Sequence, residues 1–173
     1  MNKRLLGVAM AAALMMAGAA EAAPAAAPIR TADLLQIQDL MARYEWALDF
    51  GDTKGYAALF GDDGVLVAGK SEAKGQTAIL KWLGELSARF RASRAGAPPT
   101  KIIHILSNLV VDFKGADSAD AKSFWTEVWR PDGKTMGVRE SGHYEDKLVK
   151  RGGKWWFARR QIVNDFPDAT PAP

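Results

Sequence analysis

The spacing of apolar residues changes abruptly near residue 100 of this 173-residue chain. Before that point apolar residues recur every three or four positions, which is the repeat of an amphipathic helix. After it, runs rich in Val, Ile, Trp and Phe alternate with short turn sequences, which is typical of antiparallel strands. Helices followed by a meander of strands predict an α+β fold.

The first predicted helix covers residues 31–50 and has clear end signals. Thr31 can cap its N-terminus, Asp33 is favourable in its first turn, and Gly51 suits the left-handed residue that ends a helix. Its apolar positions recur at helical spacing, and they are Leu34, Ile37, Leu40, Met41, Tyr44, Ala47 and Leu48.

Shorter elements follow this helix. Asp52 can cap a second helix that runs to about Phe60. Residues 62–64 (Asp-Asp-Gly) predict a turn before a short strand over 65–68, and a third helix is predicted over 75–90. Four longer strands are then expected over 101–113, 121–130, 135–149 and 155–164, with turns at 117–120, 131–133 and 151–153.

The N-terminus has the features of an export signal. Lys3 and Arg4 precede an apolar, Ala-rich run over 5–20, and Ala-Glu-Ala at 20–22 is a processing site of the A-x-A type. An uncleaved membrane anchor is the alternative, which the shortness of the run disfavours. We expect a periplasmic protein, free of the membrane after cleavage. Its predicted segments are a signal peptide over 1–22, a flexible leader over 23–30, a single domain over 31–166 and a disordered tail over 167–173.

Composition excludes several classes of function. The chain has 23 Lys and Arg against 20 Asp and Glu, and no basic stripe with interleaved aromatic residues, so nucleic acid is not an expected partner. Cysteine is absent, which excludes thiol catalysis, disulfides and Cys-based metal sites. Only two histidines are present, without a paired metal-binding motif, and we therefore expect no metal site.

Ionisable side chains occur at positions where a buried helix face or a strand interior would normally be apolar. Burying a charge costs several kcal/mol unless it is paired. Several such positions in one small domain predict a polar pocket, and the candidate catalytic residues are Tyr44, Asp49, His104, Glu127 and Arg160.

His104 is the central candidate, in the middle of a predicted strand. Asp49, at the end of the first helix, can accept a hydrogen bond from its imidazole and so fix its tautomer and raise its basicity. Tyr44 can donate a hydrogen bond to a substrate carbonyl or a leaving hydroxyl. A hydrogen-bonded core histidine and a core tyrosine are the structural alternatives.

Glu127 and Arg160 each leave two interpretations open. Glu127 lies between two tryptophans on its strand, either on an exposed face or in an aromatic pocket that would raise its pKa. Arg160 can bind an anionic or phenolic substrate oxygen, or it can form a structural pair with a carboxylate such as Glu127. Candidate substrate-binding residues, for which core packing is the alternative, are Trp82, Asn108, Trp125, Trp129 and Tyr144.

Several short motifs together resemble the SnoaL-like branch of the nuclear transport factor 2 superfamily. They are Tyr44-x4-Asp49 with Gly51-Asp52, Ala58-Leu59-Phe60-x-Asp62-Asp63-Gly64, His104-x-x-Ser107-Asn108, Gly142-x-Tyr144-x-Asp146 and Trp155-x4-Arg160. The resemblance covers nearly all of the predicted domain. It implies a cystatin-like cone, in which three N-terminal helices pack on a strongly bent antiparallel sheet, and it implies a homodimer or homotrimer.

The order of the candidate residues is similar to that in the dehydratases of this superfamily. Bile-acid 7α-dehydratase and scytalone dehydratase use a tyrosine, an aspartate and a histidine in a hydrophobic pocket, without a cofactor. The positions of Tyr44, Asp49, His104 and Arg160 follow the bile-acid dehydratase pattern. Glu127 stands where that pattern has an aspartate, which moves the carboxylate by one methylene and leaves the substrate open.

The sequence thus predicts a cofactorless acid–base lyase for a small hydrophobic, ring-containing alcohol. Loss of water is the expected reaction, and a related C–C cleavage, as in the lyases that deformylate lignin-derived diaryl compounds, is a variant of it. A ketosteroid-isomerase-like isomerase, a periplasmic binding module and a non-catalytic oligomerisation domain are the alternatives, because this fold hosts enzymes and non-enzymes alike.

Overall fold

The structure is a computed structural model that describes residues 30–97 and 100–167. The predicted signal peptide and leader, up to residue 29, and the predicted tail from residue 168 lie outside the described residues. Within these residues, three helices and six strands follow one another as α1 (Thr31–Phe50), α2 (Thr53–Ala57), β1 (Phe60–Ala68), β2 (Ser71–Lys74), α3 (Gln76–Ser93), β3 (Ile102–Phe113), β4 (Ser118–Trp129), β5 (Gly137–Arg151) and β6 (Lys154–Asn164). The predicted α+β class is confirmed.

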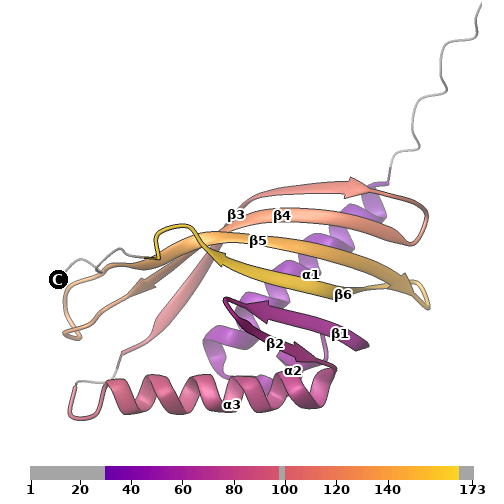
Figure 1. Cartoon of the computed structure of the whole chain (residues 1–173). Helices are drawn as coiled ribbons and strands as arrows, with labels where there is room; N and C mark the ends of the chain where they lie inside the picture. Colours follow the sequence, from indigo (N-terminus) through magenta and orange to yellow (C-terminus); the bar gives the residue numbers. More distant parts are fainter. Residues whose placement is uncertain (1–29, 98–99, 168–173) are drawn as a thin grey trace, which may run out of the picture.

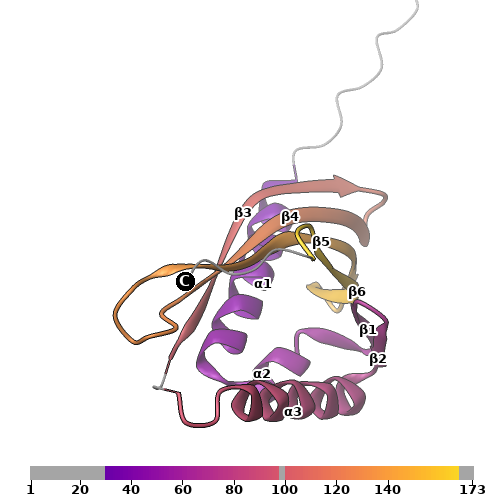
Figure 2. The same ribbon diagram turned by 60° about the vertical axis from the view of Figure 1, so that its left-hand side comes forward.

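The described strands form a curved, six-stranded sheet in the order β2-β1-β6-β5-β4-β3. Helix α1 crosses one face of the sheet, and α3 lies beside α2 and the β1–β2 pair (Figures 1 and 2). All neighbouring strands are antiparallel except β1 and β6, which pair in parallel. The sheet is therefore mixed, where the sequence predicted an antiparallel one.

The local signals at the end of the first helix are confirmed. Gly51 has φ 72° and ends α1 in the left-handed conformation, and the Asp52 side chain accepts a hydrogen bond from the Gly55 N–H at the start of α2. The predicted cap at Thr31 is wrong, because Arg30 occupies the cap position and Thr31 is already helical.

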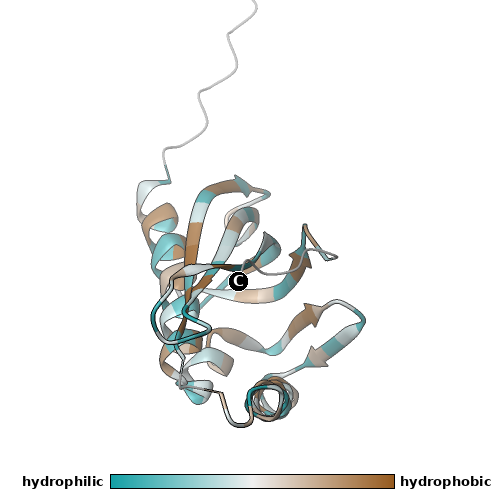
Figure 3. Cartoon of the chain, turned by 90° about the vertical axis from the view of Figure 1, so that its left-hand side faces the viewer, coloured by the Kyte–Doolittle hydropathy of each residue, from teal (hydrophilic) through white to brown (hydrophobic). Residues whose placement is uncertain are grey.

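The region after α2 differs most from the prediction. Helix α2 stops at Ala57 because Phe60 already pairs with Phe157 of β6. The predicted turn at 62–64 lies inside β1, where the register with β6 shifts between Phe60 and Val65. Strand β2 was not predicted, since its sequence Ser-Glu-Ala-Lys has no hydrophobic alternation. Apolar and polar residues do alternate along the longer strands (Figure 3).

An ion pair lies inside the aromatic core between α1 and the sheet. Arg160 is fully buried and donates two hydrogen bonds to Asp146, from Nε at 2.8 Å and from Nη2 at 2.7 Å. The two residues face each other in the β5–β6 register. The guanidinium also lies about 4 Å from three ring centroids, those of Tyr44, Tyr144 and Phe157.

Among the described residues, no helix combines the length and the apolar character needed to cross a bilayer.

Gly142 is required where β5 packs against its neighbours. A Cβ atom at this position would lie 2.0 Å from the carbonyl oxygen of Val163 and 2.8 Å from the Trp125 ring. We expect Gly142→Ala to destabilise the protein by about 1–3 kcal/mol through overpacking and to lower its Tm by at least about 3 °C. Thermal unfolding followed by circular dichroism measures this.

Gly137→Ala is the matched control on the same strand, because a Cβ atom at Gly137 would meet no other atom within 4 Å. An unchanged Tm in the Gly142 variant would contradict the close packing of β5.

Candidate active site

A cavity of about 850 Å³ lies between α1, α3 and the inner face of the sheet. Its wall combines apolar side chains with a small group of ionisable ones. Among the lining residues are Tyr44, Leu48, Asp49, Tyr56, Trp82, Leu86, Phe90, Ile102, His104, Trp125, Glu127, Arg139, Glu140, Tyr144 and Ile162. A largely apolar cavity with a few convergent polar groups is the usual form of a small-molecule site.

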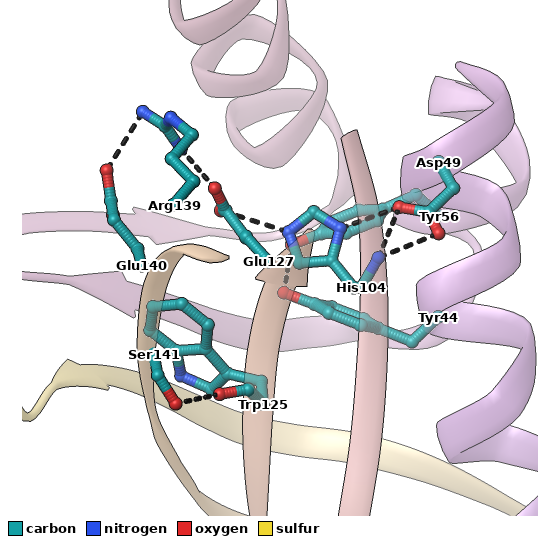
Figure 4. A network of polar contacts seen from close by, with 9 residues as sticks. All are labelled: Tyr44, Asp49, Tyr56, His104, Trp125, Glu127, Arg139, Glu140 and Ser141. Carbon is teal, nitrogen blue, oxygen red and sulfur yellow. Dashed lines mark hydrogen bonds and ion pairs between the residues drawn. The ribbon is translucent and has the colours of Figure 1, made fainter. Parts of the chain in front are cut away.

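Asp49 holds His104 from the last turn of α1. Its Oδ1 lies 2.6 Å from His104 Nδ1, and its two carboxylate oxygens also accept the backbone N–H of His104 at 3.2 and 3.0 Å (Figure 4). This N–H is available because β3 is an edge strand of the sheet. The contact predicted between Asp49 and His104 is therefore present, and it fixes both the backbone and the ring of the histidine.

Glu127 holds the other side of the imidazole. It lies directly across from His104 in the β3–β4 register, and its Oε1 is 3.1 Å from His104 Nε2. Its second oxygen accepts a hydrogen bond from Arg139, which also forms an ion pair with Glu140 at 2.9 Å (Figure 4). Of the two interpretations of Glu127, the structure supports the one in a pocket.

The imidazole between two carboxylates retains its proton in neutral solution. Burial alone would lower the pKa of His104, but the hydrogen bonds to Glu127 and Asp49 outweigh it and raise the pKa to about 9. Burial alone would likewise raise the pKa of Glu127, but the imidazolium of His104 and the charge of Arg139 bring it below its usual value. The predicted rise in the pKa of Glu127 is thus wrong, because both neighbours are cationic.

Tyr44 lies in the cavity wall with a second tyrosine behind it. The Tyr56 hydroxyl donates a hydrogen bond to the Tyr44 oxygen, and the two ring centroids are 4.4 Å apart. In this arrangement the hydroxyl proton of Tyr44 is free to be donated to a ligand. Burial raises the pKa of Tyr44, so the phenol stays neutral. Tyr56 was missed from sequence, because nothing in a short helix of five residues marks it as a pocket residue.

Arg160 lies behind the cavity wall rather than in it. Its guanidinium packs on the rings of Tyr44 and Tyr144, both of which line the cavity, and it pairs with Asp146. The possible pairing of Arg160 with Glu127 is wrong, because Arg139 forms that contact. The structural interpretation of Arg160 is the one that the geometry supports.

The five predicted substrate-binding residues divide into two groups. Trp82, Trp125 and Tyr144 line the cavity, and the buried indole N–H of Trp125 has no hydrogen-bond partner among the described residues. Asn108 is exposed, because a β-bulge between Ser107 and Val110 gives it φ 53° and takes it off the face that His104 shares. Trp129 packs beside Arg94 and Arg139 instead of facing the cavity.

A second bulge places Arg139. Glu127 pairs with Glu140 and the next residue, Val128, pairs with Val138, so Arg139 is the extra residue of β5. The bulge turns its side chain toward Glu127. Sequence reasoning missed both Arg139 and Glu140, since a bulge leaves no strong sequence signal.

In the described part of the chain, no group of three or more His, Asp or Glu side chains is placed to hold a metal ion.

The two carboxylates that hold His104 predict a specific titration. A histidine whose pKa is raised on folding adds stability below the unfolded value of about 6.5, and this contribution is lost as the pH rises through about 9. We expect the ring protons of His104 to titrate near pH 9 in an NMR experiment, and Asp49→Asn to lower that midpoint.

Asp39→Asn is the matched control for this titration, because Asp39 lies on the exposed side of the same helix and pairs with Arg43. A midpoint for His104 at or below pH 6.5 in the unchanged protein would overturn the charge assignment.

Comparison with known proteins gives the family. The family model of the SnoaL-like domain matches residues 30–161. No curated protein matches the chain. Among solved structures, a Nostoc punctiforme protein of unknown function with a cystatin-like fold is 28% identical, with 81% of this chain and 96% of that chain covered and a TM-score of 0.66.

Two further structures are similar at 25% identity. One is titled a putative scytalone dehydratase from Novosphingobium aromaticivorans, with 83% of this chain and 93% of that chain covered and a TM-score of 0.63. The other is a Catenulispora acidiphila protein in complex with S-DNPA, with 79% and 96% covered and a TM-score of 0.67. With the family match over most of its length, the chain belongs to the SnoaL-like family of the nuclear transport factor 2-like superfamily, as its motifs predicted.

Proposed function

We propose that this protein is a cofactor-independent lyase of the dehydratase type, acting on a hydrophobic aromatic or polycyclic alcohol. The observation that carries the proposal is the imidazole of His104, held between Asp49 and Glu127 in the wall of a largely apolar cavity. A purely structural histidine needs hydrogen-bond partners but no cavity, whereas a group that moves protons also needs access to a ligand.

The charge states assign the acid and the base. His104 is an imidazolium in the free protein and is the acid, whereas Glu127 is ionised and is the base. Glu127 removes a proton from the carbon next to a substrate carbonyl, and the electron pair of that C–H bond forms the new double bond. The C–O bond of the β-hydroxyl breaks, and its oxygen takes the proton from His104 Nε2 and leaves as water.

The site then resets without an external reagent. Glu127 holds the proton taken from carbon and lies 3.1 Å from the His104 nitrogen that has lost one. Transfer across this contact restores the starting state, so the reaction balances with no cofactor. Tyr44, whose oxygen already accepts a hydrogen bond from the Tyr56 hydroxyl, donates a hydrogen bond to the substrate carbonyl, keeps its proton, and stabilises the enolate-like charge.

The cavity wall supports a ring-bearing substrate. Trp82, Phe90 and Trp125 offer flat aromatic surfaces, and aliphatic side chains such as Leu86 and Ile162 fill the space between them. A volume of about 850 Å³ lies in the upper part of the range for small-molecule sites and accommodates a ligand of several fused rings.

Export to the periplasm and assembly as a homodimer or homotrimer belong to the same proposal.

Removing the imidazole tests the mechanism directly. We expect His104→Ala to lower turnover at least about 100-fold, the usual contribution of a general acid–base group, while the far-ultraviolet circular dichroism spectrum is retained. The assay is loss of one water from a panel of aromatic and polycyclic β-hydroxy ketones, followed by mass spectrometry and by the absorbance of the conjugated product.

His143→Ala is the control for this experiment, because the only other histidine is partly exposed on β5 and pairs with Asp165. Full activity of the His104 variant would rule out the mechanism. Products of unchanged mass would identify an isomerase, release of formaldehyde a C–C lyase, and recovery of unaltered ligand from every member of the panel a binding module.

The pH dependence separates an acid role of His104 from a base role. If the imidazolium is the acid, kcat/KM stays high through neutral pH and falls as the pH rises through about 9, where His104 loses its proton. It also falls in acid, below the ordinary Glu pKa of 4.5, as Glu127 becomes protonated. A neutral imidazole acting as base would give the opposite result, with kcat/KM rising through about pH 9.

A further inference from the structure

A second carboxyl group lies beside this site and has no role in the proposed reaction. Glu45, on α1 directly after Tyr44, is 5% exposed. Neither of its oxygens has a hydrogen-bond partner among the described residues. Glutamate is almost never buried in this way without a partner, because the ionised form loses its hydration and gains nothing in return.

The surroundings of Glu45 favour its uncharged form. Burial raises its pKa, and the charge of Asp49, one turn further along α1, acts in the same direction. Arg160 on β6 and His104 on β3 act against this, but Arg160 is already neutralised by Asp146, and His104 lies between Asp49 and Glu127.

The hydroxyl of Tyr144, on β5, is the neutral group that interacts with Glu45. No hydrogen bond joins the two groups in this structure, but the Tyr144 hydroxyl lowers the pKa of Glu45. Burial raises the pKa of Tyr144, and Glu45 adds to that rise. The Tyr144 ring also lines the cavity, next to Tyr44 and Trp125 at centroid distances of 5.7 and 6.2 Å.

A tyrosine has one proton to donate, and this limits what Tyr144 can do. An ionised Glu45 would accept a hydrogen bond from the Tyr144 hydroxyl, and this would turn the hydroxyl proton away from the cavity. An uncharged Glu45 does not compete for it. We propose that Glu45 is a positioning residue of this site: as an uncharged acid behind the cavity wall, it leaves the hydroxyl proton of Tyr144 free to be donated to a ligand oxygen.

This inference rests on the proposed function in one respect, since it gives the enolate-like intermediate a second hydrogen-bond donor beside Tyr44. It also accounts for an acid kept where an apolar residue would be more stable. Replacing an unpartnered buried polar group by an apolar one of similar size removes its desolvation cost. We therefore expect Glu45→Leu to raise the Tm.

Infrared spectroscopy of the free protein tests the charge state without a substrate. A protonated carboxyl has a C=O stretch outside the bands of ionised carboxylates and of the backbone. The difference spectrum between the unchanged protein and Glu45→Gln should contain this band at neutral pH, and the band should disappear in alkali. Glu45→Leu gives the same comparison if the Gln variant does not fold. Absence of the band at neutral pH would overturn the proposal.

A second measurement tests whether Glu45 acts through Tyr144. Tyr144→Phe should shift the carboxyl band, whereas Tyr44→Phe, a matched change in the same cavity wall, should leave it in place. A band that does not move in Tyr144→Phe would also overturn the proposal. In turnover, we expect Tyr144→Phe to cost about tenfold, the value of one hydrogen bond, and Glu45→Gln to cost less than about threefold at neutral pH.

The outcomes separate this inference from the lyase assignment. If no alcohol loses water but both infrared results are obtained, the assigned reaction is wrong and the placement of the Tyr144 proton is supported. If dehydration occurs and the band is absent, the reaction stands and the role of Glu45 is excluded.

Discussion

The ion pair between Arg160 and Asp146 is the interaction on which the rest of the structure depends. Both groups are completely buried, and each would be strongly destabilising without the other. Their contact requires the observed β5–β6 register, because Asp146 and Arg160 face each other across it. The guanidinium also presses on the rings of Tyr44 and Tyr144, so the same pair sets the back wall of the cavity.

Charge balance around His104 decides what the site can do. An imidazole with one carboxylate partner can be tuned to accept a proton near neutral pH, but one with two carboxylate partners retains its proton. The geometry thus favours a site in which the histidine gives its proton first and recovers it from Glu127. Arg139 and Glu140 complete this balance, and Arg139 keeps Glu127 ionised in a partly buried position.

Much of the fold could be predicted from local sequence. Helix α1 has the predicted bounds, and Gly51 and Asp52 mark its end and the start of α2, because these conformations depend on few residues. The four long strands lie within a few residues of their predictions. Strand β2 and the parallel β1–β6 pair could not be predicted, since both depend on partners distant in sequence. Catalytic roles for the residues in the cavity stay predictions.

The sequence by itself determined which groups needed partners, because polar residues at positions that a helix and a sheet must bury have to be paired. Tyr44, Asp49, His104, Glu127 and Arg160 were found from this rule together with the resemblance of their order to that of known dehydratases. Apart from the predicted contact between Asp49 and His104, only the tertiary structure decided which partner each group has. Two bulges, at Asn108 and at Arg139, change which face of the sheet a side chain takes. As a result Asn108, which was predicted to bind substrate, lies outside the cavity, and Arg139, which was not predicted, lines it. The β5–β6 register places Arg160 with Asp146, and the packing of α1 leaves Glu45 buried without a partner. Such outcomes depend on distances between segments far apart in the chain, which residue spacing does not encode.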